Sequence, residues 1–192
     1  MRKVDVWIKG FTPLLMNSNV GVNPTHPLTK EMKSLTDKRK KTDEDNERIL
    51  RLKWELGLYL EDGKPVIPAI NVEASIRDAA KIERKGKDTV ASIIVTPFEI
   101  PLIYDGPQDK EALWNDPRFR DVQVGRIQRG SVLLCRPRFS NWQLKFSLEY
   151  DEGVFDREMI KRFLTTAGMR IGLCDYRPRY GKFTLVSMEN AK

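Results

Sequence analysis

Residues 142–150 read WQLKFSLEY, in which apolar and polar side chains alternate without a break. Successive side chains of a β-strand point to opposite faces, so this pattern predicts a strand with one buried and one solvated face. The following segment, residues 156–172, reads DREMIKRFLTTAGMRIG and spaces its apolar side chains three and four positions apart, which is typical of an amphipathic helix. Asp156 is a suitable N-cap and Gly172 a natural terminator. A last strand is predicted at residues 182–188.

Two further elements are predicted in the N-terminal half. Residues 4–9 alternate, apart from Trp7, and predict a strand with Trp7 on the face opposite the core. Asn71 can cap a helix that runs to about Arg84 and carries an apolar stripe along one side. Two interpretations of Trp7 remain open: it is covered by an inserted segment, or it is a platform on which a nucleic-acid base stacks.

The order of the predicted elements indicates a fold. Residues 131–139 predict a strand that forms an antiparallel hairpin with residues 142–150. Without two inserted stretches, residues 18–67 and 86–130, the chain runs strand, helix, strand, strand, helix, strand. That order is the ferredoxin-like (RRM-like) split βαβ arrangement, an α+β fold with an antiparallel sheet, both helices on one face and the other face free to bind. We therefore expect a single domain over residues 1–192.

The first insertion has recognisable local signals. It contains a predicted helical hairpin, residues 29–41 and 43–56, in which Thr42 and Asp45 form a variant of the capping box at the start of the second helix. A β-hairpin is predicted around Asp62-Gly63. The second insertion is an apolar run interrupted by prolines, followed by a polar loop and a short helix.

Composition limits the class of protein. The chain has 34 Lys and Arg against 27 Asp and Glu, a formal net charge of +7, which favours polyanionic partners. It contains no apolar run long enough to span a membrane and no apolar segment of a secretion signal after Met1, so we expect a cytoplasmic protein without membrane contact. Cys135 and Cys174 are too few for a disulfide framework and lack metal-ligand spacing, so buried thiols are expected.

The densest functional signal is residues 170–183, RIGLCDYRPRYGKF, which contain four cations and three aromatic side chains. Arginine offers a planar fork for phosphate oxygens, tyrosine stacks on bases, and glycine lets the backbone approach a ligand closely. The candidate nucleic-acid-binding residues here are Arg170, Tyr176, Arg177, Arg179, Tyr180 and Lys182. The alternative is a structural network in which Asp175 pairs with Arg177 or Arg179.

Two other groups of cations are candidates for the same role. The first group is Arg126, Arg129, Arg136 and Arg138. Arg136 and Arg138 are two positions apart in the predicted strand, so they lie on the same face of the sheet. If the terminal strands lie near the centre of the sheet, these two arginines line one groove with residues 170–183. Alternatively, arginines on an edge strand keep the protein soluble. The second group is Lys38, Arg39, Lys40 and Lys41. These four either contact phosphate or form a solvated helix end that complements the helix dipole.

Signals for catalysis are weak. The sequence has no Walker-type loop, nucleophile elbow or His/Cys metal cluster, and its only histidine is His26, in a proline-flanked loop. A cluster of four carboxylates, Asp43 to Glu47, lies on a solvated helix start. We therefore expect no catalytic residue, no metal and no cofactor; the enzymatic alternative is an RNA-processing endoribonuclease that uses His26.

Three features resemble the RAMP superfamily: the order of elements, the segment Pro68-Ala69-Ile70-Asn71 leading into a helix that bears Arg77, and the glycine-flanked arginine loop before the final strand. Within it, the chain is similar to the backbone subunit of CRISPR effector complexes, which polymerises along single-stranded guide RNA. Residues 10–17 and 172–183 also resemble uncharacterised proteins of phages and prophages. The resemblance implies a protein that binds single-stranded RNA or DNA and forms a homo-oligomer or filament. A protein-interaction module or inhibitor that mimics an effector subunit is the remaining alternative.

Overall fold

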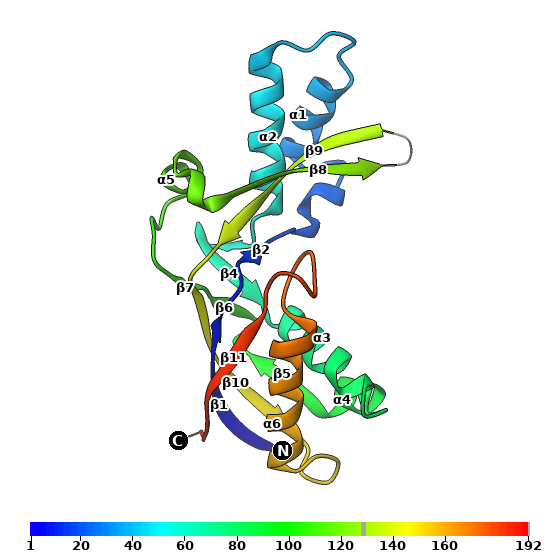
Figure 1. Ribbon diagram of the computed structural model, residues 1–192, viewed down its shortest axis with the longest axis vertical. Helices are drawn as coiled ribbons and strands as arrows, with labels where there is room; N and C mark the ends of the chain where they lie inside the picture. The colour runs from blue at the N-terminus through cyan, green and yellow to red at the C-terminus, as the bar shows by residue number, and fades with distance from the viewer. Residues whose placement is uncertain (128–129, 192) are drawn as a thin grey trace.

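The computed structural model describes residues 1–127 and 130–191. The protein is elongated, with a sheet-and-helix body at one end, which holds both termini, and a helical hairpin at the other (Figure 1). None of the described helices is both long and apolar enough to cross a membrane.

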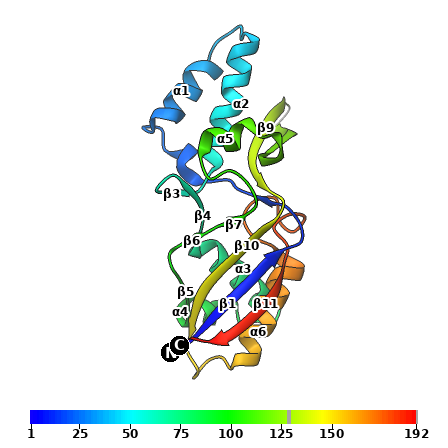
Figure 2. The ribbon, with the colours of Figure 1, turned by 90° about the vertical axis from the view of Figure 1, so that its left-hand side faces the viewer.

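The body is built on an antiparallel sheet in the order β11 (Phe183–Asn190), β1 (Arg2–Gly10), β10 (Trp142–Tyr150) and β5 (Ile93–Thr96), with β7 (Ile103–Tyr104) paired to the start of β10. Helices α3 (Ala69–Lys81) and α6 (Arg157–Thr166) cover one face, and the other face is open (Figure 2). The alternation predicted for residues 142–150 is confirmed, since the even-numbered side chains of β10 are all buried. The α+β, ferredoxin-like fold is therefore confirmed.

The predicted hairpin of residues 131–139 with 142–150 is wrong. Strand β9 (Gly130–Phe139) pairs instead with β8 (Arg120–Ile127) and β2 (Leu14–Leu15), in a second sheet. Alternation shows which side chains of a strand are buried but does not identify its neighbour, and both edges of β10 are occupied by β1 and β5.

The second strand of the split βαβ order is β5. It follows the short helix α4 (Gly86–Ser92) and lies inside residues 86–130, which were predicted to be an insertion. The extra segment therefore begins after Thr96 rather than at residue 86. It continues through β6 (Glu99–Pro101), β7, α5 (Lys110–Asn115) and the 3-10 turn η2 (Pro117–Phe119) into β8. The expected sheet order was also wrong in part, because β11 is an edge strand and β10 is central.

The helical hairpin is confirmed, with α1 at Pro27–Thr36, after the 3-10 turn η1 (Asn19–Val22), and α2 at Asp43–Gly57. Helix α1 ends at Thr36 rather than at residue 41, so residues 37–42 join the two helices. The capping box forms: Thr42 Oγ1 accepts from the backbone N–H of Asp45 at 3.2 Å, and the Asp45 carboxylate accepts from the N–H of Thr42 at 3.1 Å. Trp54 of α2 is fully buried and donates from Nε1 to the carbonyl of Phe119 at 2.8 Å. The Trp54 bond joins α2 to the segment before β8.

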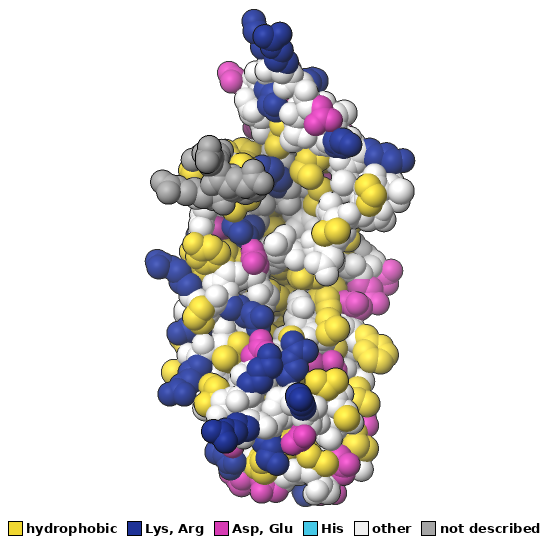
Figure 3. Space-filling view, turned by 90° about the vertical axis from the view of Figure 1, so that its right-hand side faces the viewer, with side chains coloured by type: hydrophobic (Ala, Val, Ile, Leu, Met, Phe, Trp, Pro, Cys, Tyr) yellow, Lys and Arg dark blue, Asp and Glu magenta, His cyan; other side chains and the backbone are white. Residues whose placement is uncertain are grey.

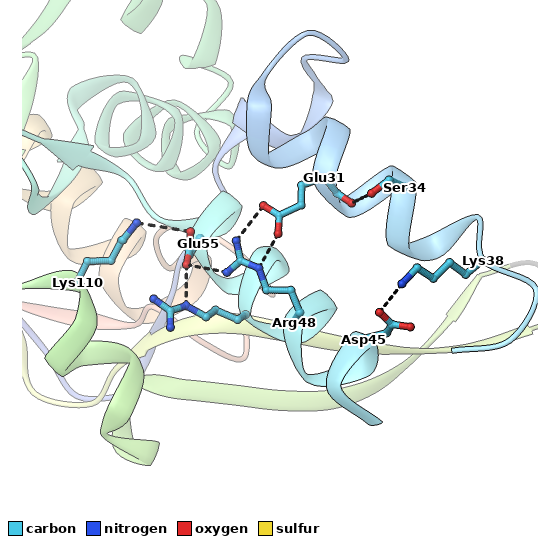
Figure 4. Close-up of polar contacts among 8 residues, drawn as sticks. Glu31, Ser34, Lys38, Asp45, Arg48, Glu55 and Lys110 are labelled. Carbon is cyan, nitrogen blue, oxygen red and sulfur yellow. Dashed lines mark hydrogen bonds and ion pairs between the residues drawn. The ribbon is translucent and has the colours of Figure 1, made fainter. Parts of the chain in front are cut away.

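Helix α1 contributes no fully buried residue, and an ion pair joins it to α2. Arg48 of α2 donates to Glu31 of α1 at 2.7 Å (Figure 4). Glu55, whose side chain is 5% exposed, lies among Arg48, Arg51 and Lys110 at 3.7, 2.8 and 3.5 Å. A buried carboxylate is stable only when it is paired in this way.

The β-hairpin at Asp62-Gly63 also forms, between β3 (Leu60–Glu61) and β4 (Lys64–Pro68), and both turn residues have positive φ. The predicted N-cap Asn71 is wrong. Helix α3 begins at Ala69 with Pro68 as its N-cap, since Pro68 is still extended and paired with Glu99 of β6. Asn71 instead directs Nδ2 to the Cys174 sulfur at 3.7 Å.

Both cysteines are free thiols. Burial raises the pKa of Cys135 to about 11 and the pKa of Cys174 to about 12. At neutral pH they are therefore protonated and poorly nucleophilic.

Candidate nucleic-acid interface

The arginine-rich loop joins α6 to β11 and is held by backbone hydrogen bonds. Helix α6 ends in a π turn at Ala167–Ile171, closed by a bond from the Gly172 N–H to the Ala167 carbonyl at 2.8 Å. Leu173 donates to the Gly181 carbonyl at 2.9 Å, and Gly181 donates to the Pro13 carbonyl at 2.8 Å. The loop is thus tied to itself and to the segment before β2, which gives it one defined shape.

Left-handed backbone conformations shape the tip of this loop. Gly172 and Gly181 have φ of +84° and +71°. Cys174 and Tyr176 also have φ near +60°, which costs a residue with a side chain roughly 1 to 2 kcal/mol. Strain of this kind gathers at functional sites, where the surrounding structure maintains it.

Two of the candidate arginines are held by carboxylates. Arg136 of β9, 16% exposed, contacts Asp175 at 2.5 Å, and its guanidinium lies 5.7 Å from the centre of the Tyr176 ring. Arg177 lies 3.6 Å from Asp78 of α3. The structural network considered for Asp175 does form, but its partner is Arg136 rather than Arg177 or Arg179.

The loop tyrosines lie together at the same place. Tyr176 and Tyr180 meet edge to face with ring centres 5.6 Å apart, and Gln123 of β8 donates to the Tyr180 hydroxyl at 3.3 Å. Tyr176 is 50% exposed, so part of its ring is available to a ligand.

An open hollow of about 570 Å³ lies beside these tyrosines. It is lined by Asp78, Arg170, Ile171, Cys174, Asp175, Tyr176, Arg177 and Pro178. Arg179 is exposed on the loop, and Lys182 is half-buried, with its backbone N–H bonded to Thr12 Oγ1 at 2.8 Å. On the side of the molecule that carries the loop, Lys and Arg side chains occur from end to end, with Asp and Glu between them (Figure 3).

The other candidate cations lie elsewhere. Arg138 lines a separate hollow of about 190 Å³ with Asp105 and Arg118. The backbone of Arg126 is part of β8, and Arg129 lies outside the described residues. The predicted common groove of Arg136, Arg138 and the loop therefore does not form as expected.

The basic run at residues 38–41 lies at the far end of the helical hairpin (Figure 1). Lys38 pairs with Asp45 at 2.7 Å, and Lys41 donates to the Lys38 carbonyl at 2.9 Å. The hydrogen bond from Lys38 lowers the pKa of Asp45. Residues 38–41 are therefore an exposed loop between α1 and α2 rather than the end of a helix, and Lys38 and Lys41 make local contacts within it.

His26 does not line the loop hollow but a separate cleft. It occupies the N-cap position of α1 and lines a cleft of about 350 Å³ with Glu55, Tyr59, Glu99 and Lys110. No residue of the loop lines this cleft.

Trp7 lies on the open face of the main sheet. It donates from Nε1 to Gln143 at 2.9 Å, and the Lys145 ammonium lies 4.7 Å from the centre of its ring. Residues of β10, rather than an inserted segment, therefore cover the ring in part.

Two residues that the sequence analysis did not identify lie beside the candidate arginines. One is Asp78 of α3, which pairs with Arg177 at 3.6 Å. Lys53 of α2 lines a pocket of about 220 Å³ together with Arg136, and burial lowers the pKa of Lys53. A lone lysine in an amphipathic helix carries no signal that could have identified it.

Comparison with solved structures supports the fold. The chain is similar to a chain in "Cryo-EM structure of the Type III-B Cmr-beta bound to cognate target RNA", with a TM-score of 0.57 and 14% sequence identity. The match covers 100% of this chain and 61% of that chain, so the protein spans about three fifths of the matched chain's length. No family model matches the sequence, and no curated protein matches it. The predicted likeness to CRISPR effector subunits is thereby confirmed as a likeness of fold.

Proposed function

We propose that this protein binds single-stranded nucleic acid, and RNA in particular, as a subunit of a multi-subunit complex related to CRISPR effectors. The observation that carries the proposal is the hydrogen-bonded loop at residues 170–182, which presents exposed cations beside an exposed tyrosine. Cations neutralise phosphates, and aromatic rings stack on unpaired bases; together they favour a single strand over a duplex. The matched chain belongs to a complex bound to target RNA, which supports RNA over DNA.

Backbone groups on both edge strands of the main sheet are already bonded to side chains, which limits how copies of this chain can assemble. Glu73 accepts from the outward N–H of Val95 in β5 at 2.9 Å, and Arg157 of α6 donates to the Met188 carbonyl of β11. Side chains that occupy edge groups discourage strand-to-strand pairing. A homo-oligomer or filament would therefore join its copies through other surfaces while they share one nucleic-acid strand.

Fluorescence anisotropy with labelled oligonucleotides tests the proposal. We expect tighter binding to single-stranded RNA than to the matching duplex. The logarithm of the affinity should fall linearly with the logarithm of salt concentration between about 50 and 200 mM, with a slope near 0.7 for each phosphate contact. Size-exclusion chromatography of the complexes would show how many copies share one strand. Binding that does not depend on salt, or no binding to any oligonucleotide, would contradict the proposal.

The cleft around His26 supplies a test of the endoribonuclease alternative, because it holds a histidine, a lysine and two carboxylates. Structured RNA would be incubated with the protein and with His26→Ala. Cleavage that the substitution abolishes would establish the enzyme; no cleavage, or equal cleavage by both proteins, removes it. A pull-down against effector subunits addresses the inhibitor alternative.

A further inference from the structure

Resting on this proposed function, we propose that the loop hollow recognises one base of the bound strand, with Asp175 accepting a hydrogen bond from an exocyclic amino group while Tyr176 stacks on the ring. The site would prefer a base with an amino group, such as cytosine, over uracil.

The charges that line the hollow argue against a site for phosphate alone. Two carboxylates, Asp78 and Asp175, face it together with two arginines, Arg170 and Arg177. Equal numbers of opposite charges give a phosphate little net attraction, and a carboxylate nearby repels it. Carboxylate oxygens are hydrogen-bond acceptors only, so the group they suit is an N–H donor.

Asp175 is prepared to accept such a donor. Its Oδ2 is held by Arg136 at 2.5 Å, and among the residues that the structure describes its Oδ1 has no hydrogen-bond partner. Arg136 also lies beside the Tyr176 ring, so one partly buried guanidinium contacts both side chains. Arg136 is therefore a positioning residue in this proposal, and the bound base would contact Asp175 and Tyr176.

The backbone supports the same arrangement. Asp175 lies between Cys174 and Tyr176, the two residues of the loop with φ near +60°. The Asp175 N–H is bonded to the Leu15 carbonyl at 2.9 Å, which anchors the residue from the other side. The left-handed pair thus places the carboxylate and the ring next to each other at the hollow.

Cytosine and uracil make a matched pair of ligands. They have nearly the same shape, but cytosine offers an amino donor where uracil has a carbonyl acceptor. Unpaired RNA bases are commonly read on this edge by side chains while an aromatic ring stacks on them. A carboxylate opposite this position gains a hydrogen bond with cytosine and is repelled by the partial negative charge of the carbonyl oxygen in uracil.

Anisotropy titrations with oligocytidine and oligouridine RNA of equal length test the inference. We expect the wild-type protein to bind oligocytidine about tenfold more tightly, in the range of one good base contact. Asp175→Asn should reduce that ratio to near one. Asp62→Asn, in the exposed β3–β4 turn, makes the same change of charge away from the hollow and should keep the wild-type ratio.

The outcomes separate this inference from the proposed function. Equal, salt-dependent affinity of the wild-type protein for both RNAs would contradict base recognition and leave nucleic-acid binding intact, and this result needs no variant to fold. If Asp175→Asn raises the affinity for both RNAs equally, the carboxylate only repels phosphate. If the substitution lowers the affinity for both RNAs equally, the Asp175 carboxylate only stabilises the loop. Absence of binding to either RNA would contradict the proposed function itself.

Discussion

Gly181→Ala is expected to lower affinity for single-stranded RNA by at least about tenfold while the protein remains folded. A Cβ at residue 181 would lie 2.0 Å from the Leu173 carbonyl oxygen and 2.7 Å from the Leu173 nitrogen. Both are backbone atoms, so no side-chain rotation relieves the clash and the two ends of the loop must separate. The left-handed φ of +71° adds roughly 1 to 2 kcal/mol, and the two hydrogen bonds of Gly181 add about 1 kcal/mol each.

Thermal unfolding and anisotropy measure the two consequences. A loss of about 3 kcal/mol corresponds to a fall in Tm on the order of 10 °C for a chain of this size. Gly63→Ala is the matched control, because Gly63 also has positive φ, +76°, but a Cβ there meets no atom within 4 Å. It should lower Tm less and leave RNA affinity unchanged. Wild-type affinity in a folded Gly181→Ala protein would show that the loop conformation is not needed for binding.

The triple variant Arg170→Ala, Arg179→Ala, Lys182→Ala is expected to lower RNA affinity on the order of 100-fold at low salt. None of the three side chains forms an ion pair within the described part of the chain, so their removal should not disturb the fold. If each contacts one phosphate, the loss is about 1 kcal/mol per contact. The slope of log affinity against log salt should also decrease in magnitude by about 2, because a single strand contributes about 0.7 per contact.

A second triple variant controls for net charge. Lys64, Lys87 and Lys161 are exposed lysines outside the loop, and replacing all three by alanine removes the same charge. Its affinity should stay within about threefold of the wild-type value, because none of the three lysines belongs to the loop or lines its hollow. Equal losses in the two triple variants would mean that total charge, rather than the loop, determines binding.

Local patterns predicted much of the fold because they report local physics. Alternation along residues 142–150 identified the buried face of β10, and Thr42 and Asp156 were recognised as helix caps from the residues that follow them. The partner of β9 was missed because pairing depends on segments far away in the chain. Strand β5 was missed because it has only four residues and no alternation of apolar and polar side chains. Its outward-facing residue, Ile94, is as apolar as the buried Ile93 and Val95.

The candidate site was predicted as a segment but not as an arrangement. The density of Arg and Tyr in residues 170–183 identified the loop, and its glycines indicated its sharp ends. The contact of Arg136 with Asp175 joins residues 39 positions apart, so no local spacing could reveal it. The opposite charges at the hollow change the expected chemistry from phosphate binding alone to phosphate binding beside a base-recognition site.

Photo-crosslinking tests the central claim most directly, namely that single-stranded nucleic acid lies on the loop at residues 170–182. Single-stranded RNA carrying photoreactive iodocytidine would be irradiated with the protein, and the crosslinked peptides identified by mass spectrometry. We expect crosslinks in the peptides that contain Tyr176 and Tyr180. Crosslinks confined to the open sheet face around Trp7 and Lys145, with none in the loop, would contradict it.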